Sequence, residues 1–165
     1  MLLLLALPAT VAAAAAPAPP PVAIGGLTLV PQAPRGAACL DGSAPGYWME
    51  TGSGAGKSGW IIHAEGGGWC WNESECAGRA KTHLGTSKVW TNTTKCYGSC
   101  DGILSSDPAI NPDFYTFNHI FVGYCDGSSF SGQREGLHQG LMYRGRANLD
   151  AVIDSVSSHA IPSAS

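Results

Sequence analysis

The 165-residue sequence is poor in charge. Only 13% of its residues are charged, and 9 Lys and Arg against 12 Asp and Glu leave a net charge of −3. Such a chain has no basic surface for nucleic acid. Beyond the N-terminus it also lacks an apolar run of about 20 residues, the length that a membrane span needs. We therefore expect neither a nucleic-acid partner nor a stable membrane anchor.

The sequence also lacks the Cys-x-x-Cys pairs typical of zinc sites, and we expect no metal and no cofactor. It has six cysteines: Cys39, Cys70, Cys76, Cys96, Cys100 and Cys125. An even number in a secreted chain indicates disulfides, with about 15 possible connectivities. Zinc binding through the spacings Cys70…Cys76 and Cys96…Cys100 is the weaker alternative.

The N-terminal residues indicate secretion. Residues 1–16 are mostly apolar and end in small residues, as in a signal peptide. Residues 17–34 are rich in Ala and Pro and are expected to form a linker. Asn72 and Asn92 stand in Asn-x-Ser/Thr sequences, which are glycosylation acceptors in secreted proteins. We expect an extracellular glycoprotein.

The remaining pattern is that of an α/β protein. Strands are predicted near 24–30, at 47–50, and at two apolar runs, 60–64 and 120–124, which should be buried on both faces. A capping pattern, Asn72 followed by Glu75, predicts a short helix through Arg79 and Lys81. A second helix is predicted by apolar residues at helical spacing: Leu149, Val152, Ile153 and Val156.

The strongest chemical signal is the sequence His-Ala-Glu-Gly-Gly-Gly-Trp-Cys at 63–70, directly after a predicted strand. Glycines let a backbone turn sharply and approach a ligand. Their N–H groups can then stabilise the negative oxygen that develops during acyl transfer, as in hydrolases with a glycine-rich oxyanion loop. The alternative is a glycine-rich surface turn.

A second stretch, Tyr-Cys-Asp-Gly-Ser-Ser-Phe-Ser-Gly at 124–132, also follows a predicted buried strand. It should therefore lie at a carboxyl end of the sheet, where open α/β sheets place their sites. Asp126 and the serines there could bind a hydroxylated ligand. Ordinary turn and helix capping is the simpler explanation of this stretch taken alone.

In combination, Glu-Gly-Gly-Gly-Trp-Cys at 65–70 and the 124–132 stretch resemble the plant pectin acetylesterase family, whose distant relatives are the Notum carboxylesterases. Residues 39–47, 102–105, 111–115 and 143–145 add to the resemblance. It implies an α/β-hydrolase-like sheet, here incomplete and limited to its N-terminal half, over residues 35–156, followed by a divergent tail at 157–165. It also implies a serine esterase that deacetylates cell-wall pectin.

The family's catalytic triad is not recognisable in this sequence. No serine stands in a Gly-x-Ser-x-Gly pattern, so we expect no catalytic residue in the chain and no activity of the chain alone. The resemblance assigns the oxyanion donors to Gly67 and Gly68, and Trp69, Asp126 and Ser129 are expected to line the site. His63 is expected to be structural, and no serine partner is evident for the other histidines: His83, His119, His138 and His159.

Three other interpretations remain open. The chain could be a non-catalytic carbohydrate-binding or decoy protein that stacks sugars on Trp69, Trp71 and Tyr124. It could be a truncated gene or splice product, for which an uncovered apolar sheet edge would argue. A Notum-like enzyme for lipidated protein would need a long apolar acyl pocket, and no such lining is visible in the sequence.

The cysteine spacing predicts specific pairs. Cys70 with Cys76, and Cys96 with Cys100, are near enough in sequence for local bridges. Cys39 and Cys125 then remain to tie the N-terminal loop to the site. Each pair requires α-carbons about 4.4–6.8 Å apart.

Overall fold

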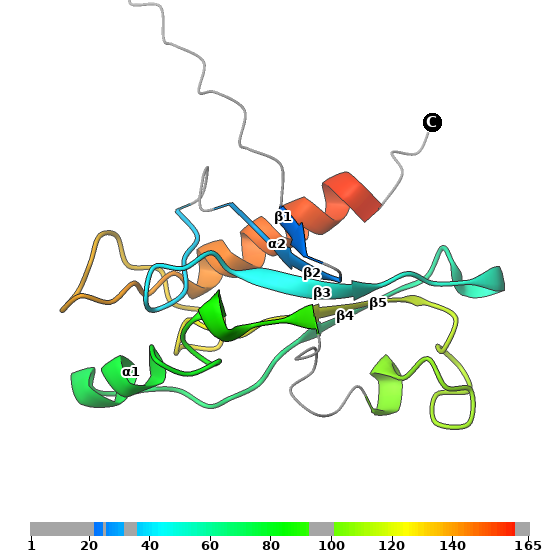
Figure 1. Ribbon diagram of the computed structural model, residues 1–165, viewed down its shortest axis with the longest axis horizontal. Coiled ribbons are helices and arrows are strands. Elements are labelled where there is room, and N and C mark those ends of the chain that lie inside the picture. The colour runs from blue at the N-terminus through cyan, green and yellow to red at the C-terminus, as the bar shows by residue number, and fades with distance from the viewer. Residues whose placement is uncertain (1–21, 25, 32–35, 93–100, 161–165) are drawn as a thin grey trace, which may run out of the picture.

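The computed structural model describes residues 22–24, 26–31, 36–92 and 101–160. Its five strands are β1 (Val22–Ile24), β2 (Leu27–Leu29), β3 (Gly46–Glu50), β4 (Trp60–Ala64) and β5 (Asn118–Val122). Its helices are α1 (Glu73–Arg79) and α2 (Gly145–Ala160), with short 3-10 turns η1 (Gly54–Gly56), η2 (Ser87–Val89) and η4 (Gly102–Leu104). Figure 1 shows α2 lying along one face of the sheet.

The strands form one mixed sheet in the order β1-β2-β3-β5-β4. β3 runs antiparallel to β5, whereas β4 and β5 are parallel, with Ile62 opposite Ile120. Because parallel neighbours end at the same edge of a sheet, the segments that follow β4 and β5 start side by side. This topology brings the two sequence motifs together.

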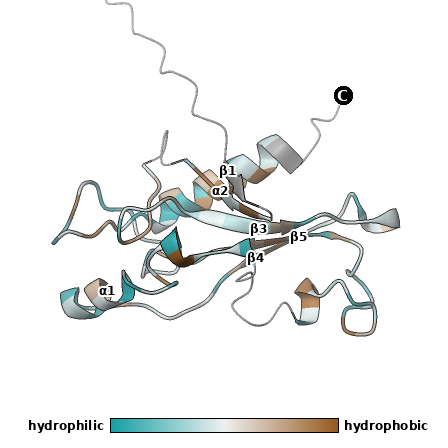
Figure 2. Cartoon of the chain, in the orientation of Figure 1, coloured by the Kyte–Doolittle hydropathy of each residue, from teal (hydrophilic) through white to brown (hydrophobic). Residues whose placement is uncertain are grey.

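The core lies on both faces of β3 and β5, because successive side chains of a strand point to opposite faces. On one face Tyr47 and Ile120 pack with Val152 of α2. On the other face Trp48 and Phe121 pack with surrounding loop residues. Figure 2 shows the strongest apolar colour in β4 and β5, whereas β3, whose core side chains are aromatic, is pale. All five residues of β5 are buried, as the sequence predicts for this strand.

β4 differs from the prediction. The run Trp60–Ala64 forms a strand, but its last three residues are exposed, and the Ile62 side chain is 46% exposed. The expectation of burial on both faces is therefore wrong. β4 lies at the edge of the sheet and pairs with β5 alone among the described strands. An apolar sequence run cannot distinguish an edge strand from a central one, because this depends on what packs beside it.

The predicted segment boundaries need two further corrections. The expected linker at 17–34 contains β1 and β2, which pair as an antiparallel hairpin, and Leu27 is buried. The expected tail at 157–165 begins inside α2, which continues to Ala160. The strand near 24–30 was predicted inside that linker, but its antiparallel pairing with β1 was not. α2 continues past Val156, the last apolar position of its pattern, because the small polar residues that follow can extend a helix without adding to that pattern.

α1 begins where the capping pattern predicts. The Asn72 side chain accepts a hydrogen bond from the Glu75 N–H at 2.9 Å. The helix ends at Arg79, two residues before the predicted end. No helix among the described residues is long and apolar enough to cross a membrane.

Candidate functional site

The glycine loop, residues 65–70, starts at the carboxyl end of β4. Glu65 continues the ladder by donating its N–H to the Val122 carbonyl at 3.0 Å, and the Cys70 N–H closes the loop on the Gly127 carbonyl at 3.1 Å. Between these anchors, the N–H groups of residues 66–69 have no acceptor among the described residues. Gly66, Gly67 and Gly68 are exposed. The loop therefore presents unpaired backbone donors to solvent, as expected for Gly67 and Gly68.

Two of the three glycines are required by the structure. A Cβ on Gly67 would lie 2.8 Å from the Leu84 side chain and 2.9 Å from the Tyr124 ring. Gly68 has a φ of 68°, a conformation that other residues rarely adopt. Gly66 has neither constraint, because nothing lies within 4 Å of the place that its Cβ would occupy.

The carbonyl side of the loop is held by two side chains. Arg79, at the end of α1, donates hydrogen bonds to the carbonyl oxygens of Gly67 and Gly68, both at 2.9 Å, and to that of Trp69 at 3.3 Å. The Tyr124 hydroxyl donates to the Gly68 carbonyl at 2.7 Å. No role for Arg79 was predicted from the sequence. The one sequence feature that points to it is its place in the last turn of the predicted helix, one turn after Cys76.

The second motif forms the neighbouring loop. The Tyr124 hydroxyl accepts a hydrogen bond from the Ser129 N–H at 3.0 Å, and the Ser129 Oγ accepts one from the Trp69 indole at 2.5 Å. Ser129 and Phe130 both adopt positive φ values, 52° and 59°. Trp69 and Ser129 are exposed beside the glycine loop, in positions where they can contact a ligand.

Asp126 occupies a different position from the one expected. Its side chain is fully buried and accepts hydrogen bonds from the Ser128 hydroxyl and from the N–H groups of Ser128 and Phe130. Burial raises the pKa of Asp126, and the hydrogen bonds from Ser128 oppose that shift. Asp126 therefore holds the shape of the 124–132 loop rather than lining an open site.

Glu65 carries an unusual carboxyl group. It is half-buried at the base of the glycine loop, and it accepts the Tyr124 N–H at 2.8 Å. Burial raises the pKa of Glu65 to about 7, and the hydrogen bond from Tyr124 only partly opposes this shift. Its position directly before the glycines was the only sequence signal for this residue.

The aromatic residues near the glycine loop differ in their exposure to solvent. Trp69 is 65% exposed and Trp71 is 81% exposed, whereas Tyr124 is buried. Tyr124 therefore cannot stack against a sugar, contrary to the carbohydrate-binding interpretation. The histidines have structural contacts: His63 stacks on Phe121, and the His119 ring nitrogen lies 3.0 Å from the Phe114 carbonyl. No cluster of three potential metal ligands occurs among the described residues.

Two predicted disulfides are confirmed. Cys39 is bonded to Cys125, with α-carbons 4.8 Å apart, and Cys70 to Cys76, with α-carbons 5.2 Å apart. The first joins the N-terminal loop to the 124–132 loop that follows β5, and the second joins the glycine loop to α1. The predicted pair Cys96–Cys100 lies outside the described residues.

Comparisons with known proteins agree with this geometry. The pectinacetylesterase family model matches residues 21–165. The chain is 44% identical to pectin acetylesterase 5 of Arabidopsis thaliana over 127 residues, 75% of this chain and 29% of that protein. It is 33% identical to the palmitoleoyl-protein carboxylesterase NOTUM of Schmidtea mediterranea, over 73% of this chain and 23% of that protein.

The fold agrees as well. The structure of the Wnt deacylase Notum from Drosophila superposes with a TM-score of 0.69 at 26% identity, covering 84% of this chain and 39% of that one. The α/β-hydrolase-like fold is thus confirmed for a partial sheet, and the chain spans well under half of each of these relatives. On the family match and on its similarity to the plant enzymes, the chain belongs to the pectin acetylesterase family.

Proposed function

We propose that this protein is a carboxylesterase of the pectin acetylesterase type, which removes O-acetyl groups from cell-wall homogalacturonan. The observation that carries the proposal is the row of unpaired N–H groups at Gly67 and Gly68. Donors fixed in this way stabilise the oxyanion of a tetrahedral intermediate, and losing one typically costs about 3–4 kcal/mol in the barrier. The plant relatives named pectin acetylesterases support the choice of substrate.

The oxyanion role can be tested on the purified chain with two matched variants. Acetylated oligogalacturonides should shift the backbone amide NMR signals of Gly67 and Gly68 more than deacetylated ones do. Gly67→Ala should abolish this difference, because its Cβ would meet Leu84 and Tyr124. Gly66→Ala should keep it, because its Cβ would meet nothing. Equal shifts with both ligands in the unmodified chain would contradict the proposed role.

We propose that the chain alone does not turn over esters. Ester hydrolysis by a covalent route needs a nucleophile with its base within about 2.6–3.2 Å, and no serine of the sequence lies in a Gly-x-Ser-x-Gly pattern. Acetylated pectin and p-nitrophenyl acetate should be hydrolysed at the background rate. Turnover that a serine-directed fluorophosphonate abolishes would show that one of these serines has an unrecognised base.

A second candidate function is carbohydrate binding without catalysis. The high exposure of Trp69 and Trp71 favours it, because exposed indole rings can stack on sugar rings. Pectin binding that is independent of acetylation, and that Trp71→Ala weakens more than Val89→Ala does, would support this function over the esterase. Val89 serves as control because it is an exposed apolar residue in η2.

The proposed location is the extracellular cell wall, reached by secretion of a glycoprotein. Asn72 and Asn92 are both exposed, as glycan acceptors must be. The Asn72 oxygen caps α1, so a glycan on its nitrogen would leave the cap intact. Expression in a secreting plant host should give a product whose mass falls on glycosidase treatment, and Asn72→Gln and Asn92→Gln should each remove one glycan.

A further inference from the structure

We infer that Arg79 is the positioning residue of the glycine loop, which it holds so that the N–H groups of Gly68 and Trp69 point toward the substrate. The inference rests on the proposed function for its consequence in catalysis. The contacts that carry it are the three hydrogen bonds from one guanidinium to three successive carbonyls, Gly67, Gly68 and Trp69.

Peptide geometry converts these contacts into a direction for the donors. In a trans peptide the C=O of one residue and the N–H of the next point in opposite directions. Because the Gly67 and Gly68 carbonyls face Arg79, the N–H groups of Gly68 and Trp69 face away from it. Neither N–H has an acceptor among the described residues. Trp69 thereby becomes a backbone donor in addition to the predicted pair.

Three consecutive glycines need such a restraint. Glycine has more backbone freedom than any other residue, so a loop of this kind loses much entropy when it is ordered. A flipped peptide would present a carbonyl oxygen to the oxyanion and repel it. A planar guanidinium with five donors can bind several carbonyls in one fixed arrangement, which a lysine ammonium cannot do.

Arg79 is itself held in place. Cys76, three residues earlier in α1, is bonded to Cys70 at the end of the loop. No carboxylate among the described residues pairs with Arg79. The positive charge of Arg79 also contributes, after burial, to the lowered pKa of His83. The positive charge of Arg79 therefore polarises the loop carbonyls that it contacts. When a carbonyl is polarised, the N–H group of the same peptide becomes a stronger hydrogen-bond donor.

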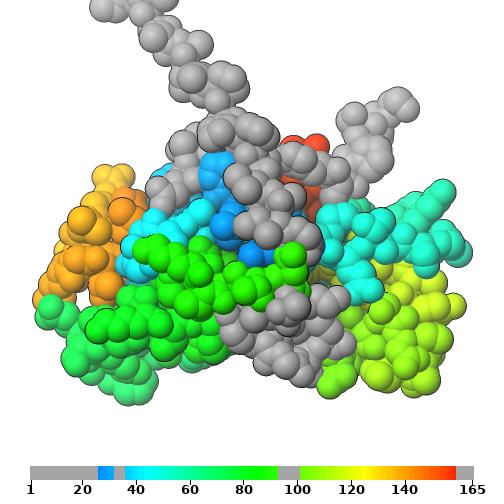
Figure 3. All heavy atoms as spheres, viewed as in Figure 1, coloured from blue at the N-terminus to red at the C-terminus, as the bar shows by residue number. Residues whose placement is uncertain are grey.

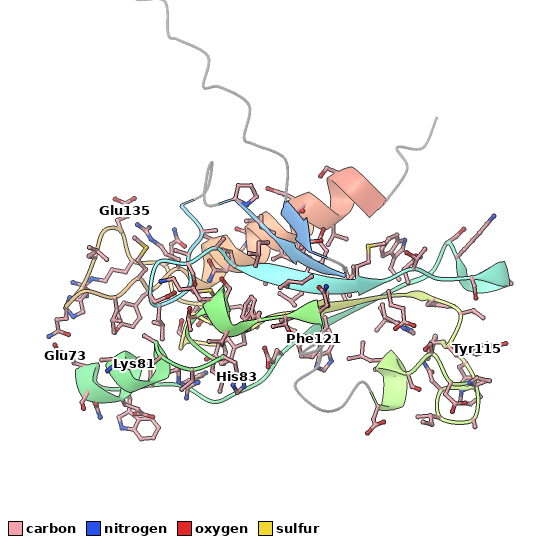
Figure 4. All side chains as sticks on the ribbon, viewed as in Figure 1. Glu73, Lys81, His83, Tyr115, Phe121 and Glu135 are labelled. Atoms are coloured by element: carbon pink, nitrogen blue, oxygen red, sulfur yellow. A yellow bond between two sulfur atoms is a disulfide. The ribbon has the colours of Figure 1, made fainter. Side chains whose placement is uncertain are left out.

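The test measures backbone order in the purified chain. In the unmodified protein the Gly68 and Trp69 amides should have NMR order parameters of about 0.85, and in Arg79→Ala they should fall below about 0.6. Arg79→Lys keeps the charge without the planar fork and should give intermediate values. Arg146→Ala, which removes an exposed arginine paired with Asp150 on α2, should change neither amide. In Figure 4 the labelled Lys81 lies beside α1, and Lys81→Ala is a second control close to the site.

Acetate, the product of deacetylation, serves as the ligand probe. It should shift the Gly68 and Trp69 amide signals in the unmodified chain and not in Arg79→Ala. A folded Arg79→Ala protein with unchanged order parameters would overturn the inference. If Arg79→Ala does not fold, fully native order in Arg79→Lys would overturn it instead, and loss of order in a folded Arg79→Lys would support it. If the order parameters fall in the Arg79 variants but acetate does not bind even to the unmodified chain, the positioning role of Arg79 is supported and the proposed oxyanion role is contradicted.

Discussion

The Tyr124 hydroxyl lies 2.7 Å from the Gly68 carbonyl and joins two loops that are 56 residues apart in sequence. The same hydroxyl accepts the Ser129 N–H at 3.0 Å, so one oxygen serves both loops. Burial raises the pKa of Tyr124, so the hydroxyl keeps its proton and remains a donor at neutral pH. The glycine loop and the 124–132 loop thus form one unit at the carboxyl ends of β4 and β5.

Tyr124→Phe should therefore lower the free energy of unfolding by about 1–3 kcal/mol, because it leaves the Ser129 N–H without its acceptor. Chemical denaturation would measure the change. Tyr115→Phe is the matched control, since Tyr115 is an exposed tyrosine and the same change there should leave stability unaltered. Figure 3 shows the segment that contains it, residues 101–117, at the end of the molecule opposite residues 133–144. Equal effects of the two variants would argue against the hydrogen bonds of Tyr124.

The two described disulfides should differ in their contribution to stability. Cys39–Cys125 spans 86 residues and Cys70–Cys76 spans six. In the chain-entropy treatment the long loop is worth about 4–5 kcal/mol and the short loop about 2 kcal/mol. Replacing the first pair by alanines should lower the melting temperature more than replacing the second. A larger loss from the short pair would show that its link between Cys70 and α1 matters beyond entropy.

The Glu65 carboxyl should make stability depend on pH near neutrality. Its pKa rises from 4.5 to about 7 on folding, so the folded state binds the proton more tightly than the unfolded state does. The resulting stability is present below pH 4.5 and is lost as the pH rises through 7. Because solvent reaches part of the carboxyl, we expect a loss of about 1–2 kcal/mol.

Denaturation of Glu65→Gln at several pH values would check this. The glutamine oxygen can still accept the Tyr124 N–H, so the variant should lose less stability than the unmodified protein between pH 5 and about 8. Glu73→Gln, an exposed change in the first turn of α1, is the control. Parallel pH profiles for Glu65→Gln and the unmodified protein would exclude Glu65 as the titrating group.

Asp41 should have the opposite pH dependence. Burial alone would raise its pKa, but hydrogen bonds from Ser43, Lys88 and Thr86 lower it to about 2. The folded state thus binds the proton less tightly, and this stability is present above pH 3.8 and is lost as the pH falls toward 2. Asp41→Asn should cost about 1–2 kcal/mol at pH 7 and should flatten the acid limb of the stability profile. An unchanged acid limb would contradict this assignment.

Local sequence signals predicted the local features of the fold. The strand at β5 and the cap at Asn72 were found because hydrophobic runs and capping residues act on their own neighbours. The Cys70–Cys76 bond was predictable because short loops close readily. The exposure of β4 was missed, because a strand's apolar sequence does not reveal its position in the sheet. The full burial of Asp126 was missed for a similar reason. Its hydrogen bonds come from its own turn, but its burial depends on distant segments that pack against it, such as Gly145 at the start of α2.

The sequence by itself determined the family, the low charge of the chain and the glycine loop as the candidate site. Only the tertiary structure decided how that loop is used. It placed Arg79 and Tyr124 on the carbonyl side of the loop and left the N–H groups of Gly68 and Trp69 unpaired. A run of glycines in a sequence indicates that the backbone is free to turn there. The direction in which each peptide of the loop points is set by side chains from other elements, which contact the loop only in the folded protein.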